Sequence, residues 1–456
     1  MNTNRNQPNM KKSILVLALS GIVQLASYGQ WTNDYLSGAR WQMGSTVIGS
    51  KVFYAGGDFD DVYSTVDIYD HATGQVVTTN MSVDRRLANA VSSGSKVLIA
   101  GGVNGQSETT DVVDVYDTIT QAWTVSQLSQ ARFGMSAVSN GTDVLFAGGA
   151  PFPPTSAYDR VDIYQGGSGT WTTAALSVPR VGMGAVFAGN KAFFAGGFSE
   201  VGVSDRVDIY DFVAGTWSTA TLSQPRWGLA AAVAGTKVLF AGGQNNSIAS
   251  DRVDIYDLNT SMWSTASLSV ARSFAFGECA TSVCGKAIFV GGGMIDETTG
   301  AFATDYSEID VYDGTSDDWS VGQLPYDLLL HSTNVLDDQI ILVAGGGTIT
   351  GSNIQLYDEI RIWEDGCGFV VGIDDVTGNT PQFTIFPNPA NDQITLVLNA
   401  WQRGNYSLID AAGRTVQQGR LVGERTVLPT ARMDRGIYLL RVEANSERVS
   451  QRIVLE

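Results

Sequence analysis

The sequence predicts an all-β protein, with a seven-bladed β-propeller over residues 30–363, a linker over 364–382 and a small Ig-like β-sandwich over 383–456. Three observations lead to this prediction. A unit of 45 to 54 residues recurs along most of the chain, the 51 Gly, 16 Tyr and 10 Trp favour short strands and turns over helices, and the period stops before residue 383. So small a unit cannot bury both faces of its sheet alone, and a closed ring of stacked sheets solves that problem.

Each repeat contains the same four landmarks. A Gly-Gly pair ends an apolar run and starts at 56, 101, 148, 196, 242, 291 and 345. A Val-Asp-Ile-Tyr block follows, as at 207–210, then a Trp such as Trp217 and an Arg such as Arg226. These landmarks divide each repeat into four short strands. Because the Arg and the Asp occur once per repeat at a fixed offset, we interpret both as scaffold rather than as a ligand-binding ring.

The closing blade is less regular. We expect residues 354–357, Ile-Gln-Leu-Tyr, to be its copy of the Val-Asp-Ile-Tyr block. Both Trp31 and Trp363 fit its outer strand, so one end of the region should complete a blade begun at the other. Six blades is the alternative, because the last repeat is long and has Leu328 at the Arg position.

Two resemblances follow from these motifs. Gly-Gly, Tyr and Trp at these intervals resemble the kelch repeat from residue 31 to about 363. Six residues of the C-terminal part resemble the type A sorting domain of the type IX (Por) secretion system: Pro387, Asn388, Pro389, Gly413, Gly436 and Tyr438. That resemblance implies a Bacteroidetes-type source, the secretion machinery as a partner, and export through the periplasm to the outer cell surface or the medium. An accessory β-sandwich is the alternative for the tail, and removal of the tail stays open.

Residues 1–29 read as a signal peptide, with Lys11 and Lys12 before an apolar run over 14–25 and small residues after it. The run is too short to span a bilayer, and no longer one follows, so we expect no transmembrane segment. The chain carries a formal charge of −18, and the leader contains three cations and no carboxylate, which makes the mature charge −21. Such acidity argues against nucleic acid and anionic membranes as partners.

The sequence favours neither a cofactor nor a metal. Two histidines, His71 and His331, lie on different blades and should not meet at one copper, as they would in the galactose oxidase-like kelch enzymes. Whether Asp58, Asp60 and Asp61 bind calcium is open, with a solvated acidic loop as the default. Cys279 and Cys284 could form a local disulfide or stay free, and Cys367 has no evident partner.

The predicted channel strands are apolar apart from Asn89, Glu278 and His331, which is too little for a general acid and base, so we expect no catalytic residues. Ligand recognition is expected on the irregular loops between second and third strands. These loops carry Phe59, Tyr63, Phe152, Tyr158, Phe198, Phe302 and Tyr306, which could bind a ligand or simply cap the blade edges. The chain therefore reads as a secreted or cell-surface binding or adhesion module for an extracellular glycan or protein. The alternative is a carbohydrate-active enzyme resembling the kelch-type sialic acid mutarotases.

Overall fold

The structure is a computed structural model that describes residues 31–59, 61–298, 301–350, 353–364 and 366–367 of the repeat region and its exit. In the C-terminal part it describes 383–386, 391–398, 403–409, 415–422, 425–431, 433, 435–444 and 447–455. The predicted leader and most of the predicted linker lie outside the described residues. Among the described residues, no helix has the length and apolarity needed to cross a membrane.

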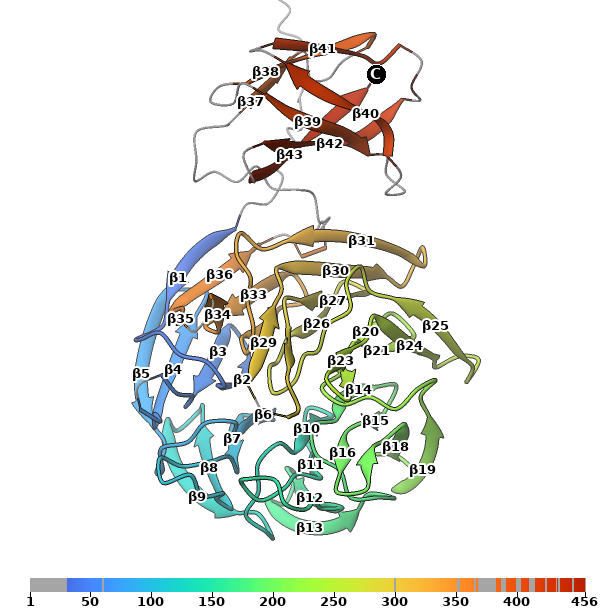
Figure 1. Ribbon diagram of the computed structural model, residues 1–456. Coiled ribbons are helices and arrows are strands. Elements are labelled where there is room, and N and C mark those ends of the chain that lie inside the picture. Colours follow the sequence, from blue (N-terminus) through green and yellow to red (C-terminus); the bar gives the residue numbers. More distant parts are fainter. Residues whose placement is uncertain are drawn as a thin grey trace, which may run out of the picture.

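The repeat region forms seven four-stranded antiparallel sheets, which Figure 1 shows arranged as a ring. The all-β prediction is confirmed. Blades 1 to 3 are β2–β5 (Gly44–Ile48, Lys51–Ala55, Thr65–Asp70, Gln75–Asn80), β6–β9 (Asn89–Ser93, Lys96–Ala100, Val112–Asp117, Ala122–Gln127) and β10–β13 (Ser136–Ser139, Val144–Ala147, Arg160–Gln165, Thr170–Ala175).

Blades 4 to 6 are β14, β15, β18, β19 (Gly184–Ala188, Lys191–Ala195, Arg206–Asp211, Thr216–Thr221), then β20, β21, β24, β25 (Ala230–Ala234, Lys237–Ala241, Arg252–Asp257, Trp263–Ser267), and β26, β27, β30, β31 (Ala280–Val283, Lys286–Val290, Glu308–Asp313, Asp318–Gln323). Blade 7 is β32, β33, β36, β1 (Ser332–Leu336, Ile340–Ala344, Glu359–Trp363, Thr32–Tyr35). The inner strands contact their neighbours all the way round, including β32 against β2.

Four blades carry an extra hairpin between their second and third strands. These hairpins are β16–β17 (Phe198–Ser199, Gly202–Val203), β22–β23 (Gln244–Asn245, Ile248–Ala249), β28–β29 (Gly293–Ile295, Phe302–Asp305) and β34–β35 (Gly347–Thr350, Asn353–Leu356). All four emerge on the same face as the loops that lead from one blade to the next. We call this the loop face, and the opposite one the turn face.

Blade 7 joins the two ends of the repeat region. Strand β1 pairs antiparallel with β36, with Thr32 opposite Ile362. Trp31 thereby lies next to Trp363, with ring centroids 5.5 Å apart. The same register places a Tyr opposite a Trp in blades 2 to 6, as Tyr116 and Trp123 in blade 2, and Tyr69 opposite Val76 in blade 1. The predicted closure is confirmed, and β1 supplies the outer strand.

The expectation for residues 354–357 is wrong. Residues 354–356 lie in β35 of the extra hairpin, whereas β36 is the third strand of the blade. Ala344 pairs with Ile360, as Ala55 pairs with Val66 in blade 1, so Arg361 occupies the Asp position and Trp363 the Tyr position. The long loop of this blade shifted the apparent spacing of the repeat.

Six blades contain a buried ion pair between the repeat Arg and the repeat Asp. In blade 1 the Arg40 guanidinium lies 2.6 Å from Asp67, and in blade 6 Arg272 lies 2.7 Å from Asp310. The Asp carboxylate also accepts a backbone N–H from the linking loop, as Asp162 does from Ser129 at 3.0 Å. The remaining pairs are Arg85–Asp114, Arg132–Asp162, Arg180–Asp208 and Arg226–Asp254. The scaffold interpretation of both residues agrees with these contacts.

The cysteine pairing is neither of the two alternatives that the sequence left open for Cys279 and Cys284. Cys284 is bonded to Cys367, with Cα atoms 5.1 Å apart, and Cys279 is a buried free thiol. Cys279 and Cys284 flank opposite ends of β26, where an extended chain of five steps covers about 16 Å. A disulfide requires Cα atoms within about 7 Å, so this strand keeps the two apart.

The C-terminal part contains two antiparallel sheets, β37–β38–β41 (Phe383–Phe386, Gln393–Leu398, Arg425–Pro429) and β40–β39–β42–β43 (Thr415–Val422, Arg403–Ile409, Gly436–Ala444, Glu447–Leu455). Ile394 and Leu396 of the first sheet share one core with Leu440 of the second. Of the predicted motif, Gly436 begins β42 and Tyr438 is buried in that core. Pro387, Asn388, Pro389 and Gly413 lie outside the described residues.

Candidate functional site

The loop-face end of the central channel is built from a backbone ring. Gly182 N donates to Gly134 O, and Gly228 N to Gly182 O, each at 3.0 Å. These glycines have φ of +63° to +68°, in the left-handed region. A Cβ on Gly228 would also lie 2.9 Å from the Cβ of Ala275 in the next blade. The residue that precedes each of these glycines in the chain therefore lies at the channel mouth.

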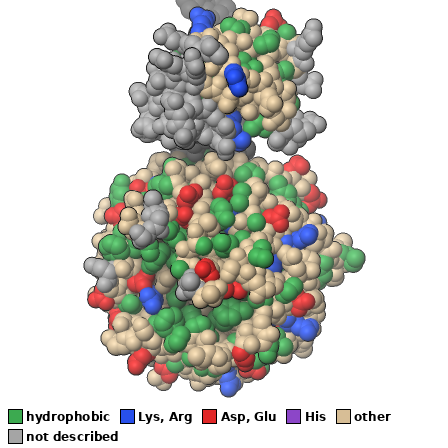
Figure 2. Space-filling view, viewed as in Figure 1, with side chains coloured by type: hydrophobic (Ala, Val, Ile, Leu, Met, Phe, Trp, Pro, Cys, Tyr) green, Lys and Arg blue, Asp and Glu red, His purple; other side chains and the backbone are tan. Residues whose placement is uncertain are grey.

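Seven aromatic residues from different blades gather at this mouth, and we call them the mouth cluster. Phe276 lies at its centre, with its ring centroid 6.0 Å from Phe133 and 5.9 Å from Trp227. Figure 2 shows apolar side chains around the middle of this face, with acidic ones among them. The members are Trp41, Phe133, Phe152, Phe198, Trp227, Phe276 and Phe302, and all except Phe133 and Trp227 are partly exposed.

Blade 6 contributes two irregular segments to the mouth. Seven residues lie between Arg272 and β26, compared with three between Arg226 and β20, and the extra turn carries Phe276 with φ of +60°. The β28–β29 hairpin carries Phe302, whose ring lies 5.9 Å from Trp41 of blade 1. Phe276 and this hairpin together cover the channel end.

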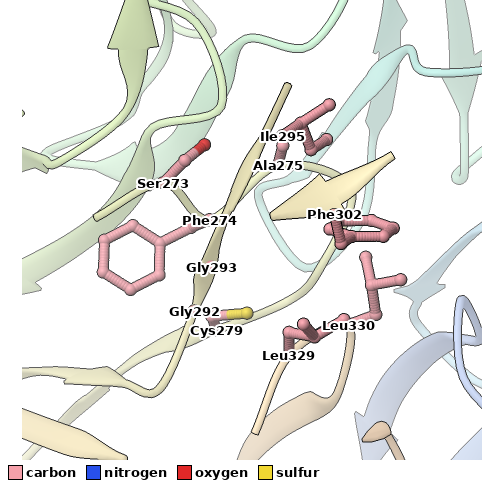
Figure 3. Close-up of a pocket in the computed structure, with 10 residues that line it drawn as sticks. All are labelled: Ser273, Phe274, Ala275, Cys279, Gly292, Gly293, Ile295, Phe302, Leu329 and Leu330. Atoms are coloured by element: carbon pink, nitrogen blue, oxygen red, sulfur yellow. The ribbon is translucent and has the colours of Figure 1, made fainter. Parts of the chain in front are cut away.

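A small cavity lies under the hairpin. Figure 3 shows it between Phe274 and Phe302, with Cys279 and Leu330 among its lining residues. Its volume is about 10 Å³, roughly the space that one water needs. Burial raises the pKa of the Cys279 thiol to about 12, so the thiol stays protonated and unreactive. The cavity is unsuited to a substrate.

The predicted binding residues divide into three groups. Phe152, Phe198 and Phe302 belong to the mouth cluster. Phe59 stands apart on the blade 1 loop, with 59% of its surface exposed. Tyr63, Tyr158 and Tyr306 hold equivalent places at the ends of their loops, where each backbone N–H donates to a carbonyl of the Gly-Gly region, such as Tyr158 N to Gly149 O at 2.8 Å. None of these three tyrosines belongs to the apolar clusters of the mouth.

Four members of the mouth cluster were not predicted: Trp41, Phe133, Trp227 and Phe276. Three of them could have been found from their position in the repeat, because Trp41, Phe133 and Trp227 each directly follow the repeat Arg. This position forms a bridge with the residue after Gly-Gly, as Phe133 does with Ala150. Phe276 could have been suspected from the extra length before β26.

The acidic loop of blade 1 forms an ion pair with Arg86. The Asp58 carboxylate forms an ion pair with Arg86, whose guanidinium lies over the Phe152 ring at 5.6 Å. Asp61 accepts from Val62 N at 2.8 Å, and Asp60 lies outside the described residues. Over the described part of the chain, no three His, Cys, Asp or Glu side chains come together as a metal site. A solvated acidic loop, which the sequence favours over a calcium site, stays the prediction for these residues.

Glu278 and His331 meet inside the channel. The Glu278 carboxylate accepts hydrogen bonds from Ser45 N, at 3.1 Å, and from Ser45 Oγ. Glu278 N donates to His331 O at 3.1 Å. Burial lowers the pKa of His331 to about 3, so its imidazole is neutral. His71 lies at a turn on the turn face, beside Tyr69, and does not meet His331. Glu278 therefore links the inner strands of blades 6, 7 and 1.

The channel position of Glu278 makes stability depend on pH. Burial raises the pKa of its carboxyl from 4.5 to about 7, although the hydrogen bonds from Ser45 oppose the shift. The pKa of Glu278 is thus higher in the folded protein than in the unfolded chain. The stability that Glu278 contributes is therefore complete below pH 4.5 and is lost as pH rises to about 7. We expect Glu278→Gln to remove this pH dependence. Between these two pH values the free energy of unfolding of the wild type should therefore fall by about 1–3 kcal/mol relative to that of the variant. Urea midpoints at both ends of the range measure it, and parallel pH profiles would contradict it.

Comparisons with known proteins match both parts of the chain. Protein-family models described as "KLHDC2/KLHL20/DRC7 Kelch-repeats domain" and "Kelch motif" match residues 134–346 and 84–126. A model described as "Secretion system C-terminal sorting domain" matches residues 384–456. A solved structure titled "Structure of YjhT" matches with a TM-score of 0.49 and 14% identity, over 63% of this chain and 99% of that chain. No curated protein matches the chain.

Proposed function

The chain is a kelch-repeat β-propeller protein that ends in a secretion system C-terminal sorting domain, and on this premise we propose that it is a non-enzymatic surface binding module. The sorting domain supports export to the cell surface or secretion, and implies engagement with the type IX secretion machinery. In our proposal the leader takes the chain to the periplasm, the tail takes it across the outer membrane, and the propeller then binds an extracellular ligand.

The observation that favours binding is the mouth cluster itself. Its seven aromatic side chains come from five blades of the propeller, and five of them are partly exposed. Aromatic side chains supply large contact areas with little loss of conformational entropy, which is why they dominate recognition surfaces. The two segments from blade 6 that complete the site depart from the repeat, as expected for loops that recognise a ligand.

A carbohydrate-active enzyme is the second candidate, and Glu278 is the residue that favours it. Its pKa near 7 is typical of a general acid or base. Its carboxylate is bound to Ser45, however, and Phe276 covers the loop-face end of the channel. Conversion of a sugar that Glu278→Gln abolishes would establish the enzyme, whereas binding without turnover supports our proposal.

Trp41 and Phe302 provide the direct test. We expect Trp41→Ala and Phe302→Ala each to weaken ligand binding about tenfold or more, because the pair forms the exposed edge of the mouth cluster. Glycan and protein arrays with the full chain identify the ligand, and calorimetry measures the affinities. Met262→Ala is the matched control, since this side chain is 68% exposed on a turn-face loop. Equal binding by all three variants would place the ligand site elsewhere.

A further inference from the structure

Glu297 presents a fixed carboxylate at the edge of the mouth cluster. Its Oε1 accepts hydrogen bonds from Trp227 Nε1 at 2.7 Å and from Gln244 Nε2 at 3.1 Å. Within the described part of the chain, its Oε2 accepts none, and the side chain is exposed. One oxygen is therefore held by the protein while the other faces solvent beside the rings.

The backbone around Glu297 is held as firmly as its carboxylate. Gln244 is fully buried and binds Ile295 twice, through Nε2 to the carbonyl at 2.7 Å and through Oε1 from the N–H at 3.0 Å. Glu297 N donates to Ser247 Oγ at 2.8 Å. Three residues of blade 5 thus position a carboxylate of blade 6, which lowers the entropic cost of binding a partner there.

The charges around the mouth favour a cation. Arg86, the basic residue beside the mouth cluster, is already paired with Asp58. Other cations of the loop face stand two strands away from the channel, at the starts of β12, β18 and β24: Arg160, Arg206 and Arg252. A carboxylate beside aromatic rings attracts a cation through both its charge and the ring quadrupoles. An anionic ligand would meet repulsion at this point.

Resting on the proposed function, we infer that the mouth cluster and Glu297 receive a lysine or arginine side chain of a basic protein partner. Lysine and arginine carry their charge on long arms that reach into a site while the rest of the partner stays on the rim. The acidic chain, with its formal charge of −18, would speed the approach of such a partner. A neutral glycan is the competing occupant, and the test separates the two.

The test uses the full chain with three probes: a short peptide of alternating lysine and serine, the matching glutamate and serine peptide, and a neutral maltooligosaccharide. We expect the lysine peptide to bind most tightly, and to weaken in high salt. Glu297→Gln, which keeps an acceptor for Trp227, should weaken the lysine peptide about tenfold. Glu297→Lys should reverse the preference towards the glutamate peptide.

The control carries the same charge change on the turn face. Asp318→Asn removes an exposed carboxylate at the start of β31, so it should change lysine-peptide binding less than about twofold. Equal losses in Asp318→Asn and Glu297→Gln, or no lysine-peptide binding at all, would overturn the inference. Oligosaccharide binding that Trp41→Ala abolishes and Glu297→Gln spares would do so too, while leaving the proposed function intact. If Trp41→Ala and Phe302→Ala change the binding of no probe, the proposed function itself fails.

Discussion

Replacing Arg226 with leucine is expected to lower the free energy of unfolding by about 3–5 kcal/mol, because it leaves a buried carboxylate without its cation. The guanidinium is 1% exposed and donates to Asp254 and, at 2.7 Å, to the carbonyl of Arg252. Burial lowers the pKa of Arg226 to about 10, and Asp254 opposes that shift. Urea unfolding followed by tryptophan fluorescence measures the loss.

Removing both charges should cost less than removing one. In Arg226→Leu/Asp254→Asn the amide oxygen can still accept the N–H of Ser223, which Asp254 accepts at 2.8 Å. Blade 7 is a natural precedent, since it has Leu328 at the Arg position and no Asp at the strand position. There Arg361 pairs with Glu359 instead and stacks over Tyr326 at 4.2 Å. A double variant as unstable as the single one would show that the cost lies in packing rather than in the unpaired charge.

Loss of the Cys284–Cys367 disulfide should destabilise the propeller by about 3–4 kcal/mol, because the bond closes a loop with a sequence separation of 83. It joins the first turn of blade 6 to the segment that leaves blade 7. Lys286 Nζ also donates to Cys367 O there, at 2.8 Å. The double variant Cys284→Ser/Cys367→Ser should therefore unfold at a lower temperature than wild type.

Cys279 supplies the control for the disulfide. Its thiol is free and buried, so Cys279→Ala should cost about 1 kcal/mol or less. Peptide mapping without reduction should find residues 284 and 367 cross-linked. A cross-link between 279 and 284, or three free thiols, would contradict the structure.

The candidate site was only partly predictable. The irregular loops of Phe152, Phe198 and Phe302 stood out because the rest of the repeat is so regular. Trp41, Phe133 and Trp227 follow the repeat Arg, in segments that read as part of the apolar channel lining. Which aromatic side chains meet depends on the curvature of the propeller, which brings residues from separate repeats together. Glu297 was evident as an acidic residue of these loops, but its contacts with Trp227 and Gln244 were not predictable, because both residues reach it from another blade.

The sequence by itself determined the four-stranded unit, its repetition, the scaffold role of its Arg and Asp, and the separate tail, since each follows from local spacing and alternation. Only the tertiary structure decided that β1, and not the segment of Trp363, is the outer strand of blade 7, that Cys284 pairs with Cys367, and that Phe276 occupies the channel mouth. The physical reason is distance along the chain. Contacts within a blade repeat with the period, whereas contacts that close the ring or cross its channel occur once and follow from three-dimensional packing.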